Sequence, residues 1–200
     1  MDEPEFKLWD RHHLIPLLRF ADIEASGLHQ DSYPMQFAWC GLDLKTTSII
    51  VKPEPEWTAK LLAAKAVEMH GITHEAASRD GVPAGDVADR LNDALAGTAV
   101  VVDSPSWDGY WTTRLFDTVG VAPRFGYNDF GKMAENLGAV YDRWCVARHS
   151  ALMDAVDHLY PHTHRADEDA LRMAALTRMF LDREWAEWLL DHASSRDGAT

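Results

Sequence analysis

Short hydrophobic runs bounded by turn residues predict β-strands, most of them near the start of the chain. The first is the apolar run from Leu14 to Ala21, which contains Arg19 and ends in acid at Asp22; such a run is typical of a buried strand. Further strands, rich in β-branched and aromatic residues, are expected at Met35 to Leu42, Thr46 to Val51 and Thr98 to Val102. Because only a short polar turn separates the first two of these, we expect them to form a hairpin.

The chain between and after these strands has helical patterns. From Pro83 to Ala96, apolar residues recur at Val87, Leu91 and Leu95 along one helix face, and Gly97 ends the segment. Further helices are expected at Trp57 to His70 before a short turn at Thr73, Trp107 to Val119, Phe130 to Tyr160 with an interruption near Gly138, and Ala166 to His192. Early strands followed by interleaved helices favour a layered α/β fold over a helical bundle.

Two acidic residues at the end of the first predicted strand form a candidate site. Residues i and i+2 of a strand point to the same face, so the carboxylates of Asp22 and Glu24 would project together, and Ser26-Gly27 would turn the chain away. Hard divalent cations prefer such oxygen ligands. A D-x-E pair is common at solvated loop edges, however, so its weight depends on what accompanies it.

Two further segments accompany the pair, and together they resemble the DEDDh branch of the DnaQ-like exonucleases. That family shows D-x-E followed by small residues and Gly-Leu, as in Asp22 to Leu28, then an apolar strand, a turn, an aromatic residue and Asp, as in Val100 to Asp108. Its third motif, H-R-A-x-x-D-A, is matched at every fixed position by His164 to Ala170. The resemblance spans residues 17 to about 185 and implies a single exonuclease domain over 1–200, with its core at about 17–192. The implied fold is α/β and ribonuclease-H-like, with a central mixed β-sheet flanked by α-helices.

The resemblance also implies an activity. It is hydrolysis of phosphodiester bonds at single-stranded 3′ ends, in the 3′ to 5′ direction, with two divalent cations about 3.5–4 Å apart at the scissile phosphate. The catalytic set would be Asp22, Glu24, Asp108, His164 and Asp169. The four acids of this set would hold Mg²⁺ or Mn²⁺, which oxygen-only ligands favour, and His164 would take the proton from the attacking water.

In the second motif, two aspartates compete for the role of metal ligand. Asp103 ends the predicted strand directly and forms a turn with Ser104-Pro105. Asp103-Ser104 stands where the family often has His-Asn. Asp108 follows an aromatic residue, as the family's ligand does, and is therefore favoured. Asp103 is then a turn-forming residue, because Asp and Ser bond to their own backbone in turns.

The third motif has two possible registers, since His162 and Asp167 also satisfy H-x₄-D. The companions Arg-Ala and Asp-Ala favour His164 with Asp169. Residues five apart lie about 140° apart around one helix, so these two can converge only if His164 is on a loop and Asp169 is in the first helical turn.

Substrate contacts are expected on both sides of the acids. By the resemblance, Leu28 and His29 would pack against the terminal bases, and Met69 and His70 belong to a His-Gly-Ile segment that lines the nucleotide pocket. Core packing is the alternative for Met69. Trp107, Tyr110 and Trp111 flank a predicted metal ligand, where stacking on a base is possible. The expected partner is single-stranded nucleic acid, with RNA favoured over DNA.

The charge of the chain limits how it could hold a polyanion. Among its 200 residues are 19 basic and 32 acidic ones, which give a net charge of −13, and no run of Lys or Arg exists. Proteins that grip long nucleic acids carry a basic patch. Bound divalent cations would offset the repulsion only at the scissile phosphate, so we expect a small contact footprint.

Composition predicts a soluble cytoplasmic protein that does not engage a membrane. The N-terminal residues show no signal-peptide pattern, and no apolar stretch approaches the roughly 18 residues that a membrane helix needs. Cys40 and Cys145 are far apart and match no metal-ligand spacing, which favours a reduced compartment. Trp185 and Trp188 are expected either in the core or in a homodimer contact.

Two other functions compete with the nuclease. A catalytically inactive nucleic-acid- or nucleotide-binding module on the same fold is disfavoured, because decay of the site would be expected to remove one of the four acids or the histidine. A zinc hydrolase built on His158, His162 and His164 is disfavoured because neither H-E-x-x-H nor a Cys/His spacing is present.

Overall fold

A computed structural model describes residue 3 and residues 15–197 of the protein. Leu14, at the start of the first predicted strand, lies outside the described residues. The strands are β1 Leu18–Ala25, β2 Pro34–Cys40, β3 Thr46–Ile50, β4 Ala99–Val102 and β5 Tyr127–Asp129. The helices are α1 Ala64–His70, α2 His74–Asp80, α3 Ala84–Leu95, α4 Pro105–Val119, α5 Phe130–Leu137, α6 Arg143–Val146, α7 His149–Leu159, α8 Ala166–Leu181 and α9 Arg183–Asp197, with short 3₁₀ turns η1 Ile15–Leu17, η2 Ala59–Leu61 and η3 Gly138–Val140.

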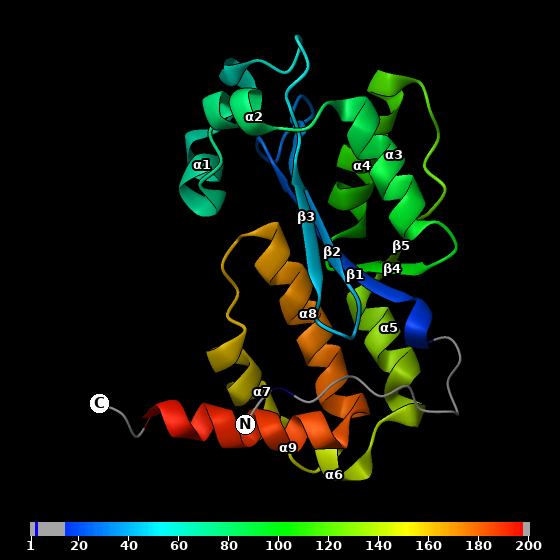
Figure 1. The fold of residues 1–200 in the computed structure, drawn as a ribbon, viewed down its shortest axis with the longest axis vertical. Helices are drawn as coiled ribbons and strands as arrows, with labels where there is room; N and C mark the ends of the chain where they lie inside the picture. The colour runs from blue at the N-terminus through cyan, green and yellow to red at the C-terminus, as the bar shows by residue number, and fades with distance from the viewer. Residues whose placement is uncertain (1–2, 4–14, 198–200) are drawn as a thin grey trace.

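The described strands form one mixed sheet in the order β3-β2-β1-β4-β5. The predicted hairpin is present, since β2 pairs antiparallel with both β1 and β3. The pairs β1–β4 and β4–β5 are parallel. Figure 1 shows α3 and α4 beside one face of this sheet and α8 against the other. The layered α/β architecture is therefore as predicted.

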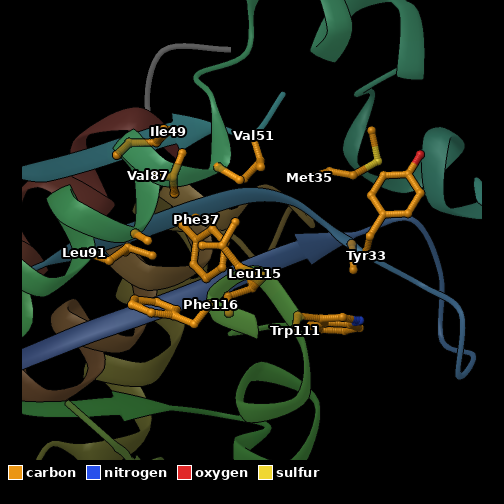
Figure 2. Packing of buried hydrophobic residues seen from close by; sticks show 14 of the residues in the cluster. Tyr33, Met35, Phe37, Ile49, Val51, Val87, Leu91, Trp111, Leu115 and Phe116 are labelled. Atoms are coloured by element: carbon orange, nitrogen blue, oxygen red, sulfur yellow. The ribbon is translucent and has the colours of Figure 1, made fainter. Parts of the chain in front are cut away.

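Alternation along the strands divides the buried side chains between the two faces. Ala21 and Ile23 of β1 belong to the same core as Phe37 of β2, and α3 and α4 cover it. Figure 2 shows this core, in which Phe37 and Ile49 from the strands meet side chains from the helices, including Leu91, Leu115 and Phe116.

The opposite face of the sheet packs against α8. Phe20 of β1, Cys40 of β2 and Val101 of β4 lie in one cluster with Ala170 and Met173 of α8. Asp22 and Glu24 have the same parity as Phe20, so the strand directs them toward the α8 face. This placement determines which helix can complete the candidate site.

The predicted long final helix is two helices, α8 and α9, which pack with α7 around a third cluster of buried side chains. The predicted segment ends at Leu181, and α9 begins at Arg183. Asp182 interrupts it because its carboxylate accepts hydrogen bonds from the Trp185 amide at 3.1 Å and from the Arg178 guanidinium at 3.1 Å. Trp185 is fully buried in this cluster, so its role is in the core.

Other predicted segments differ in their boundaries. The helix expected at Trp57 to His70 is split into η2 and α1, because the Ala63 amide donates to the Ser26 carbonyl at 2.8 Å, outside any helical bond. The turn expected at Thr73 is instead the start of α2, with the Thr73 hydroxyl accepting from the Ala76 amide. The segment from Phe130 to Tyr160 breaks into α5, η3, α6 and α7.

Cys40 and Cys145 are both free and buried. Over the described part of the chain, no helix combines the length and the apolar character needed to cross a bilayer.

Candidate active site

The first two predicted ligands, Asp22 and Glu24, project from β1 toward the start of α8. The strand continues through Ala25, further than predicted, and the turn follows, where the Ser26 amide donates to the Tyr33 carbonyl at 2.9 Å. The Tyr33 amide in turn donates to the Ser26 hydroxyl at 3.0 Å. These two bonds close the loop that carries Gly27 and hold the end of β1 in place.

Asp169 meets this pair from α8. It lies in the first turn of the helix and is buried, as the predicted register requires. One ligand atom from each of Asp22, Glu24 and Asp169 lies within 4.8 Å of the others. We call these three residues the acidic cluster. Asp22 and Asp169, which are far apart in the sequence, thus meet because α8 packs on β1.

Asp108, in α4, lies outside this group of close ligand atoms, but its charge raises the pKa of Asp22. It lies in the first turn of that helix and is only 2% exposed, and its Oδ2 has no hydrogen-bond partner among the described residues. Asp103, the competing candidate, is exposed beyond the end of β4. A buried carboxylate oxygen without a partner is costly, so the geometry favours Asp108 as the ligand.

The pKa values of three carboxyls at the site, Asp22, Glu24 and Asp108, are raised. Burial, and then the charges of Glu24, Asp108 and other acids, raise the pKa of Asp22 well above its ordinary value. Burial and the charge of Asp169 raise the pKa of Glu24 to about 8. Burial and Asp103 raise that of Asp108 to about 8. No basic side chain is among the groups that shift these three pKa values.

The donor set fits divalent cations. It consists of carboxylate oxygens from β1, α4 and α8, including the partnerless oxygen of Asp108. Hard ions such as Mg²⁺ and Mn²⁺ select such ligands, and their charge would reverse the rise in carboxyl pKa.

The loop between α7 and α8 brings both candidate histidines to Asp169. The Asp169 Oδ1 accepts from the Thr163 amide at 3.1 Å and lies 3.0 Å from His162 Nδ1. His164 is also exposed and belongs to the same group of close ligand atoms as His162 and Asp169. Sequence reasoning kept these histidines as alternatives, whereas the fold places them side by side.

Asp167, the acid of the less favoured register, is not among the close ligand atoms of the acidic cluster, although its charge also raises the pKa of Glu24. The Arg165 Nε is 3.7 Å from its Oδ1 and 3.3 Å from Glu168 Oε1. This matches the expectation that both are first-turn acids favoured by the helix dipole.

A pocket of about 310 Å³ opens next to Glu24. Three of the predicted substrate contacts, Leu28, Met69 and His70, line it, and Leu28 is 72% exposed. His70 forms a fixed wall. Its Nδ1 accepts from the Ile72 amide at 3.0 Å, so the proton lies on Nε2, which donates to the Ala25 carbonyl at 3.2 Å. Burial lowers the pKa of His70 and keeps the ring neutral.

The other two predicted contacts, His29 and Trp107, do not line the pocket. The His29 Nε2 bonds to the Leu61 carbonyl, and its ring packs so closely on Gly27 that a Cβ there would lie 2.9 Å from it. Trp107 stacks on Trp111 at 5.4 Å, and it is Trp111 that faces the pocket. The sequence offered Trp107, Tyr110 and Trp111 as stacking residues, and it could not show which face of α4 turns inward.

Two residues near the site had no signal in the sequence. Lys65, in the first turn of α1, lines the pocket and brings a positive charge to it. Tyr127, on β5, donates to or accepts from the Thr112 hydroxyl at 2.7 Å, and burial followed by the charges of Asp108 and Asp22 raises its pKa. The strand β5 is too short and polar to be found by periodicity, so Tyr127 could not be placed.

Comparison with known proteins identifies the fold. No family model matches the chain, and no curated protein matches it by sequence. Among solved structures, exonuclease I of E. coli in a zinc-bound complex with single-stranded DNA is similar at 17% identity and a TM-score of 0.59, over 88% of this chain and 42% of that one. Exonuclease I of E. coli with a dT13 oligonucleotide is similar at 18% identity and a TM-score of 0.57, over 85% and 42%. Exonuclease I from Methylocaldum szegediense is similar at 19% identity and a TM-score of 0.56, over 88% of this chain and 42% of that one.

The chain therefore spans less than half the length of these structures. Its mixed sheet flanked by helices has the ribonuclease-H-like fold, which confirms the predicted fold class.

The raised carboxyl pKa values predict that metal-free protein loses stability as pH rises. Between the unfolded pKa of about 4.3 for Glu and the folded value of about 8 for Glu24, the unfolded chain binds fewer protons than the folded one, so stability falls. The melting temperature in chelator should drop from pH 5.5 to 8.5, and Asp22→Asn should reduce the drop. Asp89→Asn, an exposed acid on α3, is the control. If the melting temperatures of wild type and Asp22→Asn depend equally on pH, the raised pKa values of the acidic cluster do not determine this loss of stability.

Proposed function

We propose that this chain is a metal-dependent exonuclease that removes nucleotides from single-stranded 3′ ends, in the 3′ to 5′ direction. The observation that carries the proposal is the convergence of Asp22, Glu24 and Asp169 within 4.8 Å, from two elements far apart in sequence. The likeness of the fold to exonuclease I, which has been crystallised with single-stranded DNA, supports the same conclusion.

The four acids would hold two divalent cations, Mg²⁺ or Mn²⁺. The acidic cluster would supply Asp22, Glu24 and Asp169, and Asp108 of α4 is near enough for its charge to raise the pKa of Asp22. When bound, such ions clamp the scissile phosphate and lower the pKa of water. The chain's own contribution is to hold these carboxylates on a strand and on the first turns of two helices.

His164 is proposed as the general base. Its imidazole would accept the proton as the water oxygen bonds to phosphorus and the bond to the leaving 3′ oxygen breaks. The ring lies on an exposed loop, so the proton can pass on to solvent, and that loop is tied to Asp169 through the Thr163 amide.

The pocket beside Glu24 would receive the terminal base. Leu28 and Met69 present apolar surface there, and a volume of about 310 Å³ is at the lower end of small-molecule sites. Lys65 would offset the acidic surroundings of the nucleotide. Acidic residues outnumber basic ones on this chain of net charge −13, so recognition would stay near the 3′ end.

We further propose that residues 17–192 act as one catalytic domain and that RNA is preferred over DNA. The structures resembling this chain contain DNA, so RNA and DNA must be compared directly. An inactive binding module on the same fold is the alternative, and the complete set of acids argues against it.

Asp22→Asn should reduce Mg²⁺-dependent cleavage of a labelled oligonucleotide by more than about a hundredfold, since even outer-shell partners of a metal cost about 10–100-fold. The fold should persist, as measured by circular dichroism, because the substitution is isosteric. Asp89→Asn should keep its activity. If the wild type binds oligonucleotides but cleaves none with either ion, the inactive-module alternative is correct.

His164→Ala should slow turnover by about 10²–10⁴-fold, the usual contribution of a general base, while Mn²⁺ affinity measured by calorimetry changes little. The matched variant His162→Ala should lose far less. Should the larger loss occur at His162 instead, the base has been assigned to the wrong histidine of the pair.

Short strands labelled at the 5′ end should yield a ladder that shortens from the 3′ end, and circular single strands should resist. Because few basic side chains would contact distant phosphates, the logarithm of the binding constant should fall with the logarithm of the salt concentration at a slope of about −1 to −3. Each neutralised phosphate contributes about −0.7 to that slope. RNA and DNA of the same sequence are digested in parallel. A slope steeper than about −5, or cleavage of circles, would instead indicate a long-groove binder or an endonuclease.

A further inference from the structure

We propose that His162, His164 and Asp169 form a second metal site, suited to a borderline transition-metal ion such as Zn²⁺. One ligand atom from each residue lies within 4.8 Å of the others. Asp169 thus belongs to two groups at once, this histidine site and the acidic cluster.

The loop between α7 and α8 is shaped so that the two histidines face each other. His164 adopts a left-handed backbone conformation with φ of 56°, which is uncommon for a residue other than glycine. The rings of His162 and His164 then lie edge to face, with their centroids 4.3 Å apart. The Thr163 amide between them donates to Asp169 Oδ1. The backbone therefore fixes the orientation of the shared carboxylate, as hydrogen bonds to metal ligands commonly do.

The distances suit zinc chemistry. Zinc binds His nitrogen at about 2.0–2.1 Å and carboxylate oxygen at about 2.0–2.2 Å, so tetrahedral ligands lie about 3.3–3.5 Å apart. His162 Nδ1 and Asp169 Oδ1 are 3.0 Å apart, close to that separation. The His162 side chain is half exposed, so its ring can rotate to complete the site. Three protein ligands would leave a fourth position for water.

The two sites would sort ions by ligand type. Imidazole favours Zn²⁺, Cu²⁺ and Ni²⁺, whereas an all-carboxylate group favours Mg²⁺ and Mn²⁺. The nearest basic side chain in sequence, Arg165, is within 4.0 Å of Asp167 and Glu168, whose carboxylates offset its charge. These acids in the first turn also offset the positive end of the α8 dipole.

An ion in the histidine site would engage Asp169 and His164 together. If the proposed nuclease function holds, on which this consequence rests, Zn²⁺ would then inhibit Mg²⁺-dependent cleavage by withdrawing one ligand and the base. The site itself does not depend on that function.

The test uses the 200-residue protein carrying Asp22→Asn, which weakens the acidic cluster but leaves the histidine site intact. Zn²⁺ binding is measured by isothermal titration calorimetry, and Co²⁺ is added as a probe whose visible absorption reports tetrahedral nitrogen and oxygen ligation. Adding His162→Ala should weaken Zn²⁺ binding by at least about tenfold, as loss of a metal's partner does, and should abolish the Co²⁺ bands. His162→Gln is the second variant, and circular dichroism checks the fold of each.

His149→Ala in the same background is the matched control, because His149 is an exposed histidine at the opposite end of α7. It should leave Zn²⁺ affinity unchanged. Equal Zn²⁺ affinity with and without His162 would overturn the proposal, even if the wild type proves to be an active nuclease. Conversely, Zn²⁺ binding that depends on His162 in a protein without nuclease activity would support the site and refute only the proposed function.

Discussion

The packing of α8 against β1 and β2 is the contact on which the candidate site depends. Phe20 and Cys40 contribute side chains to the cluster that receives Ala170 of α8, and the Cys40 thiol donates to the Ala170 carbonyl at 3.3 Å. Asp169 immediately precedes Ala170, so docking this turn brings its carboxylate to Asp22 and Glu24. A shift of one residue in the register of β1 would turn both of those acids to the opposite face of the sheet.

This arrangement opposes charge repulsion with apolar packing. Carboxyls gathered without a basic partner raise each other's pKa, which is a cost that the surrounding core must outweigh. Fully buried residues on both faces of the sheet supply that packing, and so does Trp185 of α9, which packs with residues of α8. A cation at the acidic cluster would remove much of the repulsion, so ion binding and stability should be coupled.

Asp169 connects two kinds of cation chemistry. On one side lie the carboxylates of β1, and on the other the imidazoles of His162 and His164. Both groups share this carboxylate and its charge. An ion that occupies one group would therefore affect the affinity of the other.

The sequence alone determined the layered fold and the parity of the acids, because strand periodicity and the fixed spacing of Asp22 and Glu24 are local properties of the chain. It also indicated a loop at His164 before a helix at Asp169. Only the tertiary structure decided which surfaces meet. It broke the final helix at Asp182, added β5 with Tyr127, and turned Trp111 instead of Trp107 toward the pocket. It also brought His162 to Asp169. Each of these depends on contacts between distant segments, and no local pattern of residues records which partner a side chain will find.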